Sequence, residues 1–107
     1  MKKIIFVCIA NYCRSPVAEK IMSHLAEDLK FDSCGLHPYP SGEMDSRSEQ
    51  YLTNNQIKNI THFPKKITTS LLEEAELIIP MDVIVLNSLL KNYKKYSSKI
   101  KVFNFYA

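Results

Sequence analysis

Residues 3–16 read KIIFVCIANYCRSP and combine an apolar run, a short loop and a helix-start signal. The run Lys3–Val7 is rich in β-branched residues, which is typical of a strand buried on both faces of a parallel sheet. Ser15 is a favoured N-cap residue, and Pro16 suits the first position of a helix because its missing N–H group costs nothing there. The pattern therefore predicts a strand, a tight loop and a helix that meet at Cys8.

The loop from Cys8 to Arg14 has the features of an anion-binding site. Five residues separate the cysteine from the arginine, enough for one curled turn whose backbone N–H groups surround a tetrahedral oxyanion. The positive end of the helix dipole points to the same place. These groups favour the thiolate, the nucleophilic form of cysteine, and the Arg14 guanidinium can hold two phosphoryl oxygens. We predict Cys8 as the nucleophile, with Arg14 and Ser15 as its catalytic partners.

The alternative interpretation is structural. Cysteine is often buried as a small hydrophobic residue, and Arg14 would then be an ordinary surface charge. A cysteine alone would favour this interpretation, but its combination with Asn11, Arg14, Ser15 and Pro16 favours the anion loop.

The run Val7 to Glu19 resembles the signature of the low molecular weight protein tyrosine phosphatases, approximately V-C-x-G-N-x-C-R-S-P-x-A-E. Three further stretches resemble the same family: 45–47 (DSR), His62 followed six residues later by Thr68, and 77–82 (LIIPMD). Together they cover nearly the whole chain. One departure is Ala10, where the family has glycine, and we expect a strained loop if that position needs an unusual backbone angle.

The resemblance implies hydrolysis of phosphotyrosine monoesters through a phosphocysteine on Cys8, with Arg14 and loop amides binding the phosphoryl group. The expected partners are a phosphotyrosine protein or a small aryl phosphate, with inorganic phosphate as product and no cofactor or metal. It further implies a structural network of Asn11, Ser15 and His62. The implied substrate-binding residues are Ile9, Ala10, Asn11, Tyr12, Cys13 and Tyr39.

Two of these residues keep alternative roles. Cys13 could form a protective disulfide with Cys8, as the matching cysteine of the family does, or it could be a packed thiol. Tyr39 could stack on a phosphotyrosine ring or be an exposed loop aromatic.

The family's general acid lies in an Asp-Pro pair, which we expect about ten residues beyond Ala107. Activity is therefore expected to be reduced, unless Asp45 or Glu43 replaces the acid. The alternative function is a catalytically impaired module that binds phosphate or phosphopeptides. Arsenate reduction, a third hypothesis, needs relay cysteines after the third strand, and residues 82–90 contain none.

Length and composition lead us to expect one small domain over residues 1–107, which could be truncated at its C-terminus. The apolar content of 46% is ordinary for a globular protein, and no apolar run approaches the roughly twenty residues that span a membrane. The net charge of +3 is too small to indicate nucleic-acid binding. Three cysteines form no disulfide framework, and a reactive thiolate needs a reducing compartment. We expect a cytoplasmic protein without a membrane or nucleic-acid partner.

Helical and strand patterns alternate along the rest of the chain, which predicts an α/β fold with a parallel sheet. The resemblance implies a four-stranded sheet in the order 2-1-3-4 with helices on both faces, with Cys8 at the carboxyl ends of the strands. The family's last helix would lie beyond Ala107, so a partly uncovered face predicts low stability, a homodimer or a longer natural chain. The predicted helices are 16–29, 46–54, 69–74 and 83–93, and the later strands are 31–36, 77–80 and 101–106.

Overall fold

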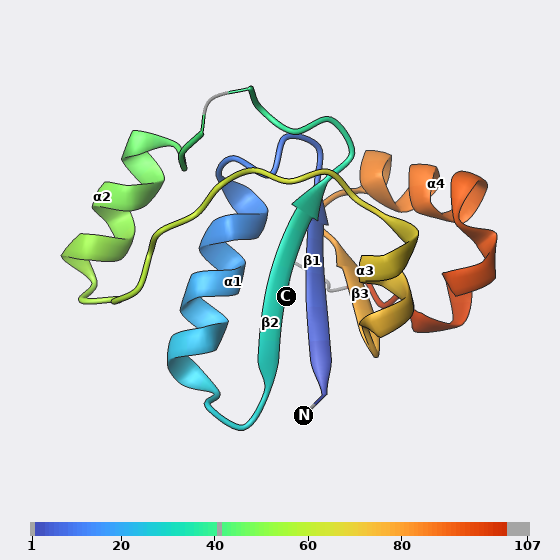
Figure 1. Cartoon of the computed structure of the whole chain (residues 1–107), viewed down its shortest axis with the longest axis horizontal. Helices are drawn as coiled ribbons and strands as arrows, with labels where there is room; N and C mark the ends of the chain where they lie inside the picture. Colours follow the sequence, from blue (N-terminus) through green and yellow to red (C-terminus); the bar gives the residue numbers. More distant parts are fainter. Residues whose placement is uncertain (1, 41, 103–107) are drawn as a thin grey trace.

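The computed structural model describes residues 2–40 and 42–102. Its strands form a parallel sheet in the order β2-β1-β3, and α1 lies on one side of this sheet while α3 and α4 lie on the other (Figure 1). The elements in chain order are β1 (Lys3–Cys8), α1 (Arg14–Leu25), β2 (Lys30–Gly35), α2 (Ser46–Asn54), α3 (Thr69–Glu74), β3 (Leu77–Pro80), α4 (Val83–Asn92) and the 3₁₀ helix η1 (Lys94–Lys99).

The central strand is β1, and both of its faces are buried. It pairs with β2 from Lys3 opposite Lys30 to Cys8 opposite Gly35, and with β3 through Ile4 to Val7. The side chains of Ile5 and Val7 are fully buried and that of Phe6 is 4% exposed, which explains the continuous apolar run of this strand. Its last residue, Cys8, therefore emerges at the middle of the sheet edge where the strands end.

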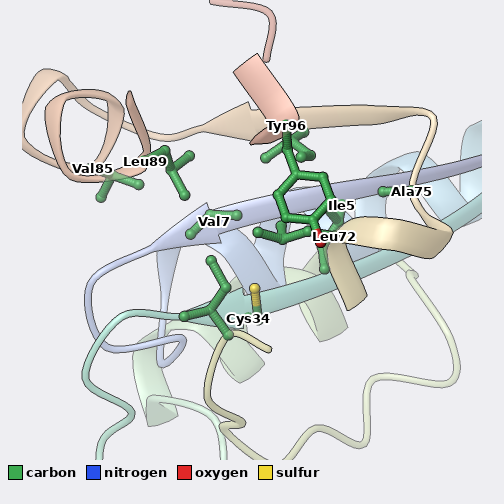
Figure 2. Packing of buried hydrophobic residues seen from close by; sticks show 10 residues of the cluster. Ile5, Val7, Cys34, Leu72, Ala75, Val85, Leu89 and Tyr96 are labelled. Carbon is green, nitrogen blue, oxygen red and sulfur yellow. The ribbon is translucent and has the colours of Figure 1, made fainter. Parts of the chain in front are cut away.

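Two hydrophobic clusters hold the helices against the sheet. On one face, Ile5, Val7 and Cys34 pack with buried residues of α3, α4 and η1 (Figure 2). On the other face, Phe6, Phe31 and Ile79 pack with partly buried residues of α1. Burial of these side chains supplies the main driving force for folding. The predicted α/β class, with helices on both faces of a parallel sheet, is thus confirmed.

The predicted fourth strand is not confirmed. The sheet of the described residues has three strands, in the order β2-β1-β3. Ile100 forms one isolated parallel bridge with Ile78, and the Lys101 N–H donates to the Ile78 carbonyl at 3.0 Å. These contacts continue the predicted order at the outer edge of β3, but a single bridge is not a strand. Most of the predicted strand 101–106 lies outside the described residues.

The first helix also differs from its predicted bounds of 16–29. It begins at Arg14, with Cys13 as N-cap, and ends at Leu25 because Ala26 adopts an extended backbone. The predicted N-cap, Ser15, lies inside the helix, where its hydroxyl is engaged by Cys8 instead. Leu29 extends the apolar pattern because it packs against the sheet from the turn rather than from the helix. The bounds of α2 are as predicted, and those of β2 and α4 differ by one residue.

Across the described ranges, every helix is too short or too polar to traverse a lipid bilayer.

Candidate active site

Cys8 ends β1 with its sulfur surrounded by polar groups. The Asn11 backbone N–H donates to the sulfur at 3.1 Å, and the Ser15 Oγ lies 2.8 Å from it. The residue is only 3% exposed. The sulfur is therefore held by two hydrogen-bonding groups that can stabilise negative charge.

Asn11 connects the loop to the rest of the protein. Its Nδ2 donates to the Ser15 Oγ at 2.9 Å, and its Oδ1 accepts the Lys65 backbone N–H at 2.9 Å. Because the Ser15 oxygen already accepts this bond, its own hydrogen is available to the Cys8 sulfur. The residue is fully buried. The amide of Asn11 thus orients the hydroxyl that faces the sulfur.

The loop curls at Asn11 rather than at Ala10. Asn11 has a φ of 50°, and Ala10 is absent from the positive-φ residues of the described chain. Asparagine tolerates this left-handed region better than most residues. The strain expected from alanine at position 10 therefore does not arise.

His62 supports the same turn from the segment that follows α2. Its Nε2 lies 2.8 Å from the Asn11 carbonyl oxygen, and because a carbonyl only accepts, Nε2 carries the hydrogen. Burial lowers the pKa of His62, against the opposite effect of this hydrogen bond. The structure brings Asn11, Ser15 and His62 together, although His62 contacts the main chain of Asn11 and not its side-chain amide.

The lowered pKa of His62 predicts a loss of stability in mild acid. The unfolded histidine binds a proton near its ordinary pKa of 6.5, while the folded one binds it only at lower pH. The free energy of unfolding should therefore fall as the pH drops from about 6.5 towards the folded pKa. Urea denaturation at pH 7.5 and pH 5.5 measures this slope. His62→Gln should flatten it, and an unchanged slope in that variant would assign the effect to another group.

Arg14 forms an ion pair with Asp82, which lies two residues after the end of β3. Its Nη1 lies 2.8 Å from Asp82 Oδ2, and the Arg14 side chain is 49% exposed. Asp82 also caps α4 by accepting the Val85 N–H at 2.8 Å. Burial alone would raise the pKa of Asp82, but the Val85 hydrogen bond and the Arg14 guanidinium together lower it. No role was predicted for Asp82 from the sequence, and the structure shows that it forms an ion pair with Arg14, the predicted phosphate-binding arginine.

Two substitutions of Asp82 separate its roles. Asp82→Ala removes both the cap and the ion pair, and should lower the free energy of unfolding by about 1 kcal/mol. Asp82→Asn keeps a capping side chain, so its stability should stay within about 0.5 kcal/mol of wild type, because half-exposed ion pairs contribute little. Both variants should lose about 3- to 10-fold in turnover if the ion pair orients Arg14. Denaturant unfolding and phosphatase assays measure these effects, and full turnover in Asp82→Asn would exclude the orienting role.

Gly35 lies against the loop and was not singled out from the sequence. A Cβ atom at this position would lie 2.7 Å from the Ile9 carbonyl oxygen and 2.8 Å from the Asn11 nitrogen. Next to it, the Leu36 N–H donates to the Cys8 carbonyl at 3.1 Å and the His37 N–H donates to the Ile9 carbonyl at 2.7 Å. The end of β2 therefore supports the loop through direct backbone contact that leaves no room for a side chain.

The other predicted site residues lie on or beside the loop. Ile9, Ala10 and Tyr12 are half-buried and Cys13 is exposed, and no hydrogen bond of the described residues uses the N–H groups of Ala10, Tyr12 or Cys13. The Tyr39 ring stacks on the Tyr12 ring with centroids 4.1 Å apart. Its N–H donates to the Ala10 carbonyl at 2.9 Å. Tyr39 thus lies against the loop through both its ring and its main chain.

Cys34 and Asp45, two further reactive side chains, have contacts that indicate structural roles. Cys8, Cys13 and Cys34 are free thiols. Burial raises the pKa of the Cys34 thiol to about 12, which makes it a poor nucleophile. Asp45, the suggested substitute acid, caps α2 by accepting the Ser48 N–H at 3.1 Å. Within residues 2–40 and 42–102 there is no group of three or more potential metal ligands.

Comparisons with known proteins agree with this geometry. The family described as low molecular weight phosphotyrosine protein phosphatase matches residues 3–107. The low molecular weight phosphotyrosine protein phosphatase of Saccharomyces cerevisiae is 36% identical over 92% of this chain and 65% of its own length. A protein-arginine-phosphatase of Bacillus subtilis is 29% identical over 91% of this chain and 67% of its own length.

The fold is also similar to that of a solved structure. The low molecular weight protein tyrosine phosphatase SP-PTP of Streptococcus pyogenes superposes with a TM-score of 0.89 at 31% identity, covering 97% of this chain and 73% of that one. The chain spans between 55% and 70% of the length of the curated relatives it matches. The matched region includes the complete loop from Cys8 to Ser15, so the chain belongs to the low molecular weight phosphotyrosine protein phosphatase family.

Proposed function

We propose that this protein hydrolyses phosphotyrosine monoesters through a phosphocysteine intermediate on Cys8. The observation that carries the proposal is the hydrogen-bonded sulfur, which has the Asn11 N–H at 3.1 Å and the Ser15 Oγ at 2.8 Å. Donors of this kind can stabilise negative charge on an attacking sulfur at the point where β1, the loop and α1 meet. The N–H groups of Ala10, Tyr12 and Cys13, for which residues 2–40 and 42–102 provide no acceptor, are suitable donors for the oxygens of a phosphoryl group.

In the first step, the Cys8 thiolate attacks phosphorus. A sulfur–phosphorus bond forms, the ester bond breaks, and the phenolate leaves with the bonding electrons and takes a proton from solvent or an acid. Arg14 neutralises charge on the equatorial oxygens, and Asp82 limits where its guanidinium can lie. The Ser15 hydroxyl, oriented by Asn11, stabilises the sulfur each time it carries negative charge.

In the second step, water attacks the phosphocysteine and releases inorganic phosphate and the thiolate. Asp82 does not supply protons in this scheme because its lowered pKa keeps it ionised. Phenols should leave far better than alkoxides, since the pKa of a phenol is near 10. Phosphotyrosine is therefore favoured over phosphoserine.

The aromatic pair of Tyr12 and Tyr39 also favours an aryl substrate. Their stacked rings lie beside the loop, and Tyr39 is 45% exposed. Such a pair can pack against the phenyl ring of phosphotyrosine. Several relatives are named as tyrosine phosphatases, which agrees with an aryl phosphate substrate. Another relative is named as a protein-arginine-phosphatase, so phosphoarginine is the competing substrate to test.

The direct test is turnover of p-nitrophenyl phosphate, whose leaving group needs little acid help. Phosphotyrosine, phosphoserine and phosphoarginine peptides are compared under the same conditions, and phosphotyrosine should have the highest kcat/KM of the three. If no ester is hydrolysed but inorganic phosphate still protects the chain against heat, the protein is an anion-binding module. If phosphoarginine is the best substrate, the loop is catalytic but the proposed substrate class is wrong.

A further inference from the structure

A hollow of about 460 Å³ lies beside the loop and is not used by the mechanism above. Tyr12, the fourth residue after Cys8, forms one of its walls. The hollow and the proposed phosphate cradle therefore share a residue. The residues that line the hollow are Tyr12, Gly42, Glu43, Met44, Ser46 and Phe63.

Backbone contacts keep the walls of the hollow next to the loop. The Asp45 N–H donates to the Tyr12 carbonyl at 3.0 Å, which ties the segment 42–46 to the loop. Phe63 follows His62, whose ring contacts the Asn11 carbonyl at 2.8 Å. A Cβ atom at Gly42 would lie 3.7 Å from the Phe63 ring, so the ring lies close to the opposite wall. The hollow is thus built by the same contacts that hold the proposed active site.

Apolar side chains and polar groups share the inner surface of the hollow. The lining residues include the aromatic Tyr12 and Phe63, together with Met44, which is 3% exposed. Phe63 is 64% exposed, an unusual position for phenylalanine in a folded domain. Burying this ring against a second apolar surface would be favourable. An acidic side chain placed against these apolar groups would lose part of its hydration, which is unfavourable.

We propose that this hollow is a specificity site that binds an aliphatic or aromatic side chain of the substrate protein, within three residues of its phosphotyrosine. The inference rests on the proposed function, since it takes the phosphoryl group to lie in the cradle beside Tyr12. An extended peptide advances about 3.3 Å per residue. A neighbouring side chain can therefore reach the adjoining hollow while the phosphoryl group stays in place.

The test measures peptide binding, so it does not depend on turnover. In the Cys8→Ser background, which cannot form the phosphocysteine, dissociation constants are measured for phosphotyrosine peptides with alanine at the flanking positions. Leucine or glutamate is then placed at each position from −3 to +3 in turn. Leucine should strengthen binding about 5- to 20-fold at one position, and glutamate should weaken it there.

Three variants in the same background assign the preference to the hollow. Phe63→Ala should reduce the leucine preference to less than about 2-fold, while Phe63→Leu should retain most of it because the wall stays apolar. Tyr51→Ala is the matched control, since Tyr51 is an aromatic residue of α2 that is 53% exposed and does not line the hollow. Heat protection by inorganic phosphate reports on the cradle in every variant.

The outcomes separate this inference from the proposed function. Absence of a leucine preference at all six positions, or a preference that survives Phe63→Ala, would overturn the specificity site. If the wild-type chain does not hydrolyse p-nitrophenyl phosphate, the proposed function is overturned, while the peptide-binding result can still be interpreted. Phosphopeptides that do not bind at all would overturn both.

Discussion

Cys8→Ser is expected to reduce p-nitrophenyl phosphate turnover by at least about 10⁴-fold, because removal of a nucleophile eliminates the covalent route. Serine is nearly the size of cysteine, but its hydroxyl does not ionise at neutral pH, so the Asn11 and Ser15 hydrogen bonds have no thiolate to stabilise. Protection by inorganic phosphate should remain, since the loop amides and Arg14 are unchanged. Initial rates and thermal unfolding with phosphate measure the two properties.

Cys34→Ala is the matched control for this experiment. It also removes a buried thiol, but Cys34 lies in the hydrophobic cluster on β2 and has its pKa raised to about 12 by burial. The variant should lose some stability through the lost packing and keep its turnover per folded molecule. Substantial turnover by Cys8→Ser would contradict the phosphocysteine mechanism, whatever the control shows.

Gly35→Ala is expected to give the largest effect among residues that do not touch the substrate. The new Cβ would lie 2.7 to 2.9 Å from atoms of Ile9 and Asn11, two of them backbone atoms that cannot rotate away. The loop must shift to relieve this overlap, at a cost of about 3 kcal/mol in the free energy of unfolding. Because a displacement of about 1 Å can cost about 10²-fold in rate, turnover should fall by at least that factor. Denaturant unfolding and initial rates test both values.

The second glycine gives a matched control. A Cβ atom at Gly42 would lie 3.7 and 3.8 Å from carbon atoms of Phe63, which is ordinary contact. Gly42→Ala should therefore keep its stability within about 0.5 kcal/mol and its turnover of p-nitrophenyl phosphate close to that of wild type. Equal losses in both variants would indicate a general intolerance to alanine and not the close approach of β2 to the loop.

Local sequence patterns predicted most of the elements because each pattern acts over a few residues. The run Lys3–Val7 predicted β1 through its apolar β-branched residues, and the predicted helix 69–74 coincides with α3. The predicted end of α1 was wrong, because the apolar spacing continues to Leu29 although the helix ends before Ala26. Periodicity reports which side chains face the core and does not report whether a helix or a turn carries them.

The candidate site was predicted only in part, for a related reason. The spacing of Cys8, Arg14 and Ser15 is a short-range pattern, so it could be recognised in the sequence. Asp82 and Gly35 reach the loop through the sheet, from sequence distances of 68 and 27 residues to Arg14 and Cys8. Their role depends on parallel pairing, which brings the carboxyl ends of three strands together.

The order of residues alone therefore determined the alternation of strands and helices and the family, and it predicted the loop from Cys8 to Arg14 as the nucleophile loop. Tertiary structure decided which carboxylate holds Arg14, which glycine permits the loop to curl, and that Asn11 rather than Ala10 adopts the left-handed turn. The physical reason is that a local motif needs only neighbouring backbone geometry, whereas these contacts exist only after the sheet has formed and the hydrophobic clusters have fixed the distances between its strands.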